Sequence, residues 1–132
     1  MVAEVNPKQA WNILREKPTA ILLDVRSKVE FDYVGHPVDA VHVPIQEAPD
    51  WQTDPDFVQK VIERLGESSR DITILTICRS GKRSMLAAQL LEAQGYTHTA
   101  NIAEGFEGDL DENRHRGNVN GWRFLGLAWE QT

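Results

Sequence analysis

Hydrophobic residues along this chain occur in two patterns, which predict an alternation of strands and helices. Short continuous runs rich in β-branched residues are typical of strands buried on both faces, and they occur at 20–25, 40–43, 72–77 and 98–103. Between them, apolar residues at helical spacing or in longer runs predict helices over 7–17, 57–65 and 85–93. This alternation predicts an α/β fold with a parallel sheet covered by helices on both faces.

Capping signals predict where two helices begin. Ser27 and Glu30 have capping-box spacing, so a short helix is expected over 28–34. Thr53 is expected to cap the helix over 57–65, at the end of a polar loop.

The strand at 72–77 is followed directly by Cys78, the only cysteine of the chain, and then by a polar turn at 79–84 and the third helix. A glycine-containing turn from strand to helix gathers backbone N–H groups around one point, in front of the positive end of the helix. In open parallel sheets, ligands bind outside the carboxyl ends of strands. Cys78 is therefore expected at the centre of a binding site.

Charges near Cys78 favour its thiolate form. Arg79, Lys82 and Arg83 lie within five residues of the sulfur, and residues 72–91 contain no Asp or Glu. A helix N-terminus and neighbouring cations promote ionisation of a thiol. The alternative is a structural cysteine buried at a strand end, but such a thiol has no need of three cations. We therefore expect a cysteine nucleophile that binds a small anion.

Length and composition restrict the classes of protein to consider. With 132 residues, of which 41% are hydrophobic, residues 1–132 are expected to form one domain around one core. The net charge of −6 disfavours nucleic acid and anionic membranes as partners. A single cysteine excludes an internal disulfide and fits a reducing cytoplasm, where we expect the protein. The four histidines lack metal-ligand spacing, so neither a metal nor a cofactor is expected.

Three segments of the chain resemble the single-domain rhodanese family of thiosulfate sulfurtransferases. The first signature of that family is matched by Asp24-Val25-Arg26, Glu30-Phe31, Gly35-His36, Ala40 and Pro44. The active-site loop C-R-x-G-x-R-[ST] is matched by Cys78-Arg79-Ser80-Gly81-Lys82-Arg83-Ser84. The terminal block is matched by Gly121-Trp122, Gly126-Leu127 and Trp129.

The resemblance implies a rhodanese-like three-layer fold with a central parallel sheet of about five strands. It implies that Cys78 carries a persulfide, taking sulfur from thiosulfate or a similar donor and passing it to cyanide, a low-molecular-weight thiol or a protein thiol. Residues 79–84 would form the substrate-binding loop, in which Arg79, Lys82 and Arg83 hold the anionic donor. We expect Ser84 to be structural and leave the role of Ser80 open.

Other residues are expected to support the site or line it. Asp24 and Arg26 follow each other at the end of a buried strand, where such a pair usually ties loops together, so we expect structural support from them. Trp51 is expected at the mouth of the pocket.

One segment departs from the family pattern. Residues 107–120 separate the start of the terminal block from its tryptophan, and they carry acidic residues followed by Arg114, His115 and Arg116. We call this segment the insertion loop. It could form a lid or an acceptor-docking loop over the site, or it could be a solvated surface loop.

Two alternative functions remain open at this point. Cysteine-dependent phosphatases, including those on the same fold, have five residues between Cys and Arg, whereas Cys78 and Arg83 have four residues between them. The shorter loop suits one sulfur atom better than a phosphate, which disfavours a phosphatase or arsenate reductase. A non-catalytic sulfur carrier or redox sensor would need the same loop as the enzyme, and the sequence does not separate it from a sulfurtransferase.

Overall fold

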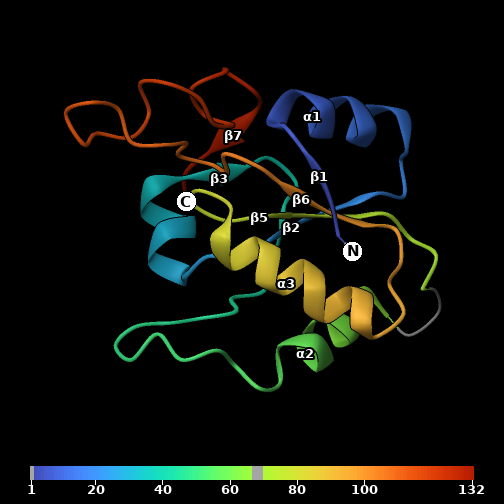
Figure 1. Ribbon diagram of the computed structural model, residues 1–132. Coiled ribbons are helices and arrows are strands. Elements are labelled where there is room, and N and C mark those ends of the chain that lie inside the picture. The colour runs from blue at the N-terminus through green and yellow to red at the C-terminus, as the bar shows by residue number, and fades with distance from the viewer. Residues whose placement is uncertain (1, 67–69) are drawn as a thin grey trace.

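The computed structural model describes residues 2–66 and 70–132, and its centre is a five-stranded sheet (Figure 1). The strand order is β1-β6-β5-β2-β4, and every neighbouring pair is parallel. The strands are β1 (Ala3–Val5), β2 (Ile21–Asp24), β4 (Val41–His42), β5 (Ile74–Ile77) and β6 (Thr99–Ile102). The predicted parallel α/β sheet is therefore confirmed.

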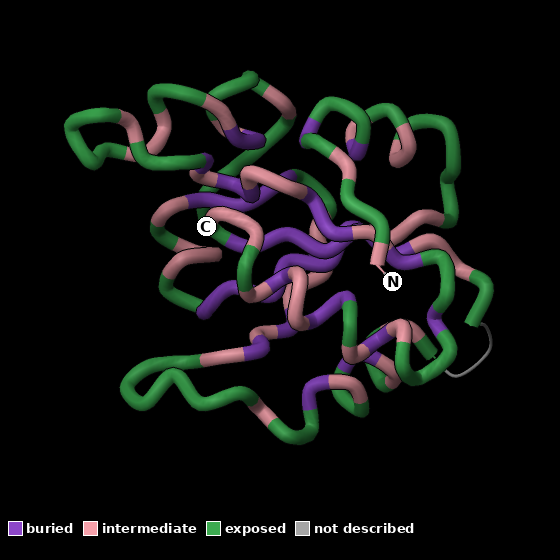
Figure 2. The backbone as a smooth tube through the Cα atoms, in the orientation of Figure 1, coloured by how far each residue is buried: buried purple, intermediate pink, exposed green. Residues whose placement is uncertain are grey.

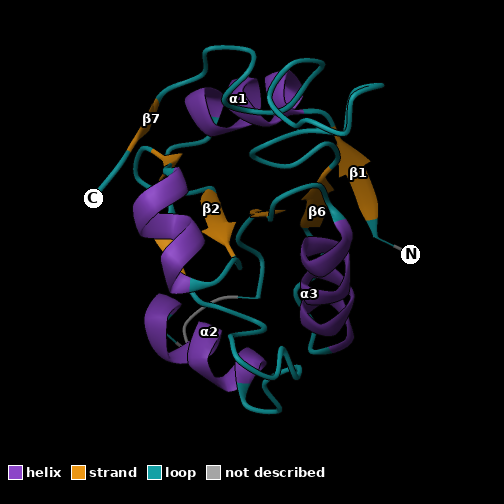
Figure 3. Ribbon diagram, turned by 90° about the vertical axis from the view of Figure 1, so that its left-hand side faces the viewer, coloured by secondary structure: helices purple, strands orange, loops and turns teal. Residues whose placement is uncertain are grey.

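Helices cover both faces of this sheet. Helix α1 (Pro7–Glu16) lies over one face, while α2 (Phe57–Leu65) and α3 (Lys82–Ala93) lie over the other (Figures 1 and 3). The three layers agree with the expected arrangement. Within the described part of the chain, no helix combines the length and the hydrophobicity that crossing a lipid bilayer would require.

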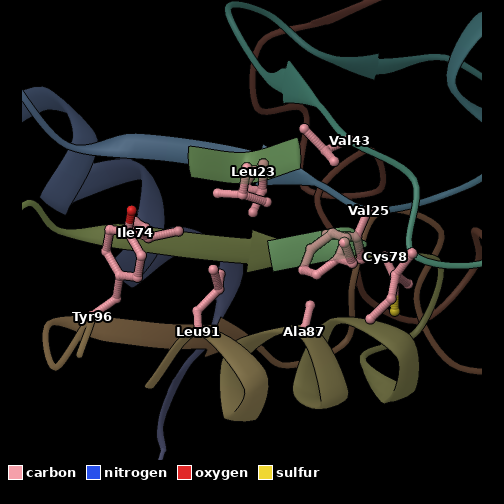
Figure 4. Close-up of a cluster of buried hydrophobic side chains, with 11 residues drawn as sticks. Leu23, Val25, Val43, Ile74, Cys78, Ala87, Leu91 and Tyr96 are labelled. Carbon is pink, nitrogen blue, oxygen red and sulfur yellow. The ribbon is translucent and has the colours of Figure 1, made fainter. Parts of the chain in front are cut away.

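The core divides into two clusters, one on each face, because successive strand residues point to opposite sides. Ile74 of β5 packs with the α2 and α3 side, whereas Leu75 packs with the α1 side. Buried residues are accordingly concentrated in the central strands of the sheet (Figure 2). Figure 4 shows the first cluster running along β5 to Cys78, which stands at its end beside the first turn of α3.

The Ser27–Glu30 capping box is present, as expected. The backbone N–H of Ser27 donates to the Glu30 carboxylate at 3.2 Å, and the backbone N–H of Glu30 donates to Ser27 Oγ at 3.4 Å. The helix that follows continues as a π-helix, η1 (Glu30–Val34), and it ends where the Gly35 N–H donates to the Glu30 carbonyl.

Two expectations about helix starts are wrong. Thr53 does not cap α2, because it pairs instead with Gln46 in an isolated β-bridge; α2 begins after Asp56, which makes no capping bond with its side chain. Helix α3 begins at Lys82 rather than Met85, directly after Gly81, whose φ of 111° reverses the chain. Lys82, Arg83 and Ser84 therefore occupy the first turn of α3.

Three short strands were not expected from the hydrophobic pattern. They are β1 at the sheet edge and the antiparallel pair β3 (His36–Pro37) and β7 (Trp129–Glu130). Each contains only two or three residues, too few to produce a recognisable period.

Candidate active site

The Cys78 sulfur lies at the carboxyl end of β5 and accepts two hydrogen bonds. The donors are the backbone N–H of Gly81, at 3.1 Å, and the hydroxyl of Ser84, at 3.2 Å. Cys78 as a whole is only 1% exposed. Two donors directed at one sulfur stabilise negative charge on it, because hydrogen bonds to an ionised acceptor are the strong ones.

The contact of Ser84 with the sulfur differs from the structural role expected for this residue. Ser84 is fully buried in the first turn of α3, and no side chain caps that helix. Its carbonyl accepts a hydrogen bond from the Thr76 hydroxyl at 2.9 Å, which holds the turn against β5. The Ser84 hydroxyl is thereby aimed at Cys78 rather than at the helix end.

Hydrogen bonds from residues 101–107 hold the loop of residues 78–84, here called the cysteine loop, in place. The Cys78 carbonyl accepts from Phe106 N–H at 2.8 Å, and the Arg79 carbonyl accepts from Glu107 N–H at 3.0 Å. Gly105 makes this approach possible, since a Cβ added to it would lie 2.5 Å from the Arg79 carbonyl. The amide of Asn101 donates to the Gly81 carbonyl at 3.1 Å. The loop is therefore fixed by β6 and the segment that follows it.

Arg83, one of the three cations expected to hold the donor, forms an ion pair with Glu30. Its guanidinium donates to both carboxylate oxygens of Glu30, at 2.7 and 2.8 Å. Burial alone would raise the pKa of Glu30, but the hydrogen bonds and charge of Arg83, together with the bonds from Ser27, lower it to about 2. The pKa of Arg83 is raised, since the attraction of Glu30 outweighs the opposing effect of burial.

Arg79 and Lys82 remain available to a ligand. Both are exposed, and within residues 2–66 and 70–132 neither has a carboxylate at ion-pair distance. The expectation that three cations hold an anion therefore needs revision: Arg83 is neutralised by Glu30. Glu30 was not expected at the site, although its place in the first signature and its charge, opposite to that of Arg83, were signals for it.

Asp24 and Arg26 form a fully buried ion pair beneath the site, 2.7 Å apart. Arg26 also donates to the Gly35 carbonyl at 2.6 Å, and its guanidinium lies 4.5 Å from the centre of the Phe106 ring. Its Nη1 has no hydrogen-bond partner among the described residues, and the stacking on Phe106 is its main compensation. The pair links the end of β2 to η1 and to the segment behind the cysteine loop.

A pocket of about 1080 Å³ opens over Cys78. The cysteine loop and the first turns of α3 line it. Trp51 also lines this pocket, in agreement with the expectation that it lies near the site. Residues of the insertion loop complete the lining, so this segment contributes to the site. The residues lining the pocket are Glu30, Gln46, Trp51, Cys78, Arg79, Ser80, Lys82, Arg83, Leu86, Glu107, Leu110, Arg114, His115 and Arg116.

No group of three or more potential metal ligands occurs in the part of the chain that the structure describes. His36 and His42 instead stack on the two faces of Phe31, with ring centres 3.7 and 4.2 Å from it. Both histidines therefore have packing roles.

Comparisons with known proteins agree with this architecture. The family model for the rhodanese-like domain matches residues 6–112. The crystal structure of Rv0390 from M. tuberculosis superposes with a TM-score of 0.88 at 35% identity, covering 99% of this chain and 98% of that one. A Rickettsia conorii protein, RC0915, is 32% identical over 98% of both chains. The thiosulfate sulfurtransferase GlpE of Actinobacillus pleuropneumoniae is 30% identical over 80% of this chain and 83% of its own length.

The fold and the site define an α/β protein with a cysteine loop at the carboxyl edge of a parallel sheet. The family match covers most of the chain, and this chain belongs to the rhodanese-like domain family. The family model ends inside the insertion loop, at residue 112, whereas the two full-length relatives extend over the remaining segment as well.

Proposed function

We propose that this protein is a sulfurtransferase that moves a sulfane sulfur from thiosulfate, or a similar anionic donor, to a thiophilic acceptor through a persulfide on Cys78. Membership of the rhodanese-like family and the likeness to the thiosulfate sulfurtransferase GlpE support a role in sulfur transfer. The observation that carries the proposal is the Cys78 sulfur, held by two hydrogen-bond donors at the base of a cationic pocket.

The reaction is a double displacement. The Cys78 thiolate attacks the outer sulfur of thiosulfate, the sulfur–sulfur bond of the donor breaks, and sulfite leaves with the bonding electron pair. A nucleophilic acceptor, such as cyanide or a thiolate, then attacks the outer sulfur of the persulfide. The bond between the two sulfurs breaks, and the Cys78 thiolate is regenerated without an external oxidant or reductant.

Five residues of the loop have roles in this scheme that follow from their positions. The N–H of Gly81 and the hydroxyl of Ser84 stabilise the charge on the Cys78 sulfur before the attack and after the transfer. Arg79 and Lys82, exposed and unpaired in the described structure, hold the oxygens of the donor and of the leaving sulfite. Arg83 shapes the pocket through its ion pair with Glu30.

Hydrolysis of a phosphate ester and reduction of arsenate are disfavoured by loop length. Four residues separate Cys78 from Arg83, and Arg83 donates to Glu30 through both Nη1 and Nη2. A phosphoryl or arsenate group would therefore lack the bidentate arginine that stabilises its transition state in such enzymes.

The test is the intact mass of the protein before and after incubation with thiosulfate, followed by addition of cyanide. We expect the mass to rise by one sulfur atom, the increment to map to Cys78, and cyanide to remove it with release of thiocyanate. A Cys78→Ser variant that is folded by circular dichroism serves as the control. A protein that gains no sulfur contradicts the thiosulfate proposal, and persulfidation without repeated turnover identifies a sulfur carrier instead of an enzyme.

A further inference from the structure

The pocket over Cys78 has a second cationic wall, provided by the insertion loop. Arg114, His115 and Arg116 line the pocket together with Leu110 and one acidic residue, Glu107, of the same loop. In Figure 1 this loop and the loop containing residue 51 project on the side of the molecule where β5 ends. The site is therefore lined in part by two segments that are distant from the cysteine loop in the sequence.

The insertion loop is stabilised by hydrogen bonds within it. The carboxylate of Asp111 accepts hydrogen bonds from the backbone N–H groups of Asn113 and His115, both at 2.8 Å, and from the Asn118 amide at 2.9 Å. These contacts lower the pKa of Asp111, the His115 bond first and the Asn118 bond second. The turn that carries Arg114 is therefore held in place from within.

The base of the insertion loop is closed by tight backbone packing. A Cβ added to Gly108 would lie 2.0 Å from the Asn120 carbonyl oxygen. The side chains of Asp109 and Asn120 bond to each other at 2.9 Å, and Asn120 Oδ1 also accepts from the Asp109 N–H at 2.8 Å. The two ends of the loop thus meet at a fixed point beside the cysteine loop.

The charges on this second wall are available to a ligand. Arg116 is half-buried and donates to the Gly108 carbonyl at 2.7 Å, while Arg114 is exposed. In the described part of the chain, neither guanidinium has a carboxylate at ion-pair distance. Arg79 and Lys82 face the same pocket, whereas the chain as a whole carries a net charge of −6.

The size of the pocket exceeds what thiosulfate requires. Ligand sites for drug-sized organic molecules span roughly 300–1000 Å³, and this pocket measures about 1080 Å³. Thiosulfate bound for attack by Cys78 would occupy only the part of the pocket next to that sulfur. The remainder combines the cations of the insertion loop with apolar surface from Trp51, Leu86 and Leu110, which suits an organic molecule bearing anionic groups.

We propose that Arg114 and Arg116 form a second anion subsite that binds the carboxylates of a low-molecular-weight acidic thiol, with its sulfur directed to Cys78. This inference rests on the proposed function and names its acceptor class. The thiolate of the bound molecule attacks the outer sulfur of the Cys78 persulfide, the bond between the two sulfurs breaks, and the molecule leaves as a persulfide. The subsite positions the acceptor without taking part in the bond changes.

Binding is tested by calorimetric titration with S-methylglutathione, an unreactive molecule with two carboxylates, and with its diethyl ester, in which both are neutralised. We expect the acid to bind about tenfold more tightly than the ester to the unmodified protein, which corresponds to one charge-assisted hydrogen bond. The variants R114Q and R116Q should lose this preference, and R116K should retain most of it. Equal binding of acid and ester, or no binding of either, overturns the inference.

A matched control separates the subsite from bulk charge. Lys17 is an exposed residue after α1, at the opposite edge of the sheet from Cys78, and K17Q removes one positive charge just as R114Q does. We expect K17Q to bind both molecules as the unmodified protein does. An equal loss of preference in K17Q and R114Q attributes the effect to net charge and overturns the subsite.

Kinetics distinguish failure of this inference from failure of the proposed function. With thiosulfate as donor, we expect R114Q to raise the KM for glutathione about tenfold and the KM for cyanide by much less. If the persulfide forms and cyanide is turned over, but glutathione and its diethyl ester are equivalent acceptors, the inference fails and the proposed function stands. If no persulfide forms at all, the proposed function fails, and the titration alone decides the subsite.

Discussion

Glu30 and Arg83, which are 53 positions apart in the chain, form a bidentate ion pair at the edge of the pocket over Cys78. The side chains of both residues are 17% exposed. Arg83 also lies 5.9 Å from the centre of the Trp51 ring. This pair connects η1, the first turn of α3 and the loop before α2, so it fixes the shape of one side of the pocket. It also removes Arg83 from the set of cations that a donor can use.

Replacing Glu30 with Gln should destabilise the fold in a pH-dependent way. Glu30 has a pKa of about 2 in the folded protein against 4.5 normally, so its contribution is complete above about pH 5 and declines as the pH falls towards 2. We expect E30Q to lose about 2 kcal/mol near neutral pH and to approach the unmodified protein in acid. Urea unfolding of both proteins across this range measures the difference. A difference that does not depend on pH contradicts the assignment.

Arg79 and Arg83 should respond differently to the same substitution. Because Arg79 is exposed and unpaired in the described structure, R79Q should raise the KM for thiosulfate several-fold with little change in the melting temperature. Because Arg83 is paired with Glu30, R83Q should lower the unfolding free energy by about 2 kcal/mol. Steady-state kinetics and thermal unfolding of both variants provide the comparison. An unchanged stability of R83Q would show that the ion pair is not a structural element.

Ser84 should matter for sulfur transfer more than Ser80 does. The Ser84 hydroxyl donates to the Cys78 sulfur at 3.2 Å, so S84A removes one of its two donors. We expect kcat to fall about tenfold, the effect of one hydrogen bond to a charged group. Ser80 lines the same pocket, and S80A is the matched control, for which we expect a smaller change. Equal effects of the two variants would argue against a specific contact of Ser84 with the reacting sulfur.

Gly105 should tolerate a side chain far less well than Gly126. Both have a left-handed backbone conformation, with φ of 68° and 73°, so alanine strains each by about 1–2 kcal/mol. At Gly105 the added Cβ would also lie 2.5 Å from the Arg79 carbonyl carbon and oxygen, whereas at Gly126 nothing lies within 4 Å. We expect G126A to lose only the strain energy and G105A to lose more, together with its capacity for sulfur transfer. Denaturant unfolding and the mass assay measure both effects, and equal stabilities would contradict the close packing behind the cysteine loop.

The amino-acid sequence alone predicts the α/β class, the parallel sheet and the position of Cys78 after a strand. These features depend on local signals: continuous β-branched runs, helical spacing and the polar turn between the strand at 72–77 and its helix. It also predicts the capping box of Ser27 and Glu30, because the partners of a capping box are only three positions apart.

Which charges are free to bind a ligand depends on tertiary packing and could not be predicted from the sequence. In sequence, Arg83 is equivalent to Arg79, and its pairing with Glu30 follows from the packing of η1 beside α3. The same holds for Ser84, whose direction depends on the hydrogen bond from Thr76, and for Arg114 and Arg116, which reach the pocket because the insertion loop closes at Gly108 and Asn120. Contacts between segments distant in the chain depend on how elements pack in three dimensions, and no local pattern encodes them.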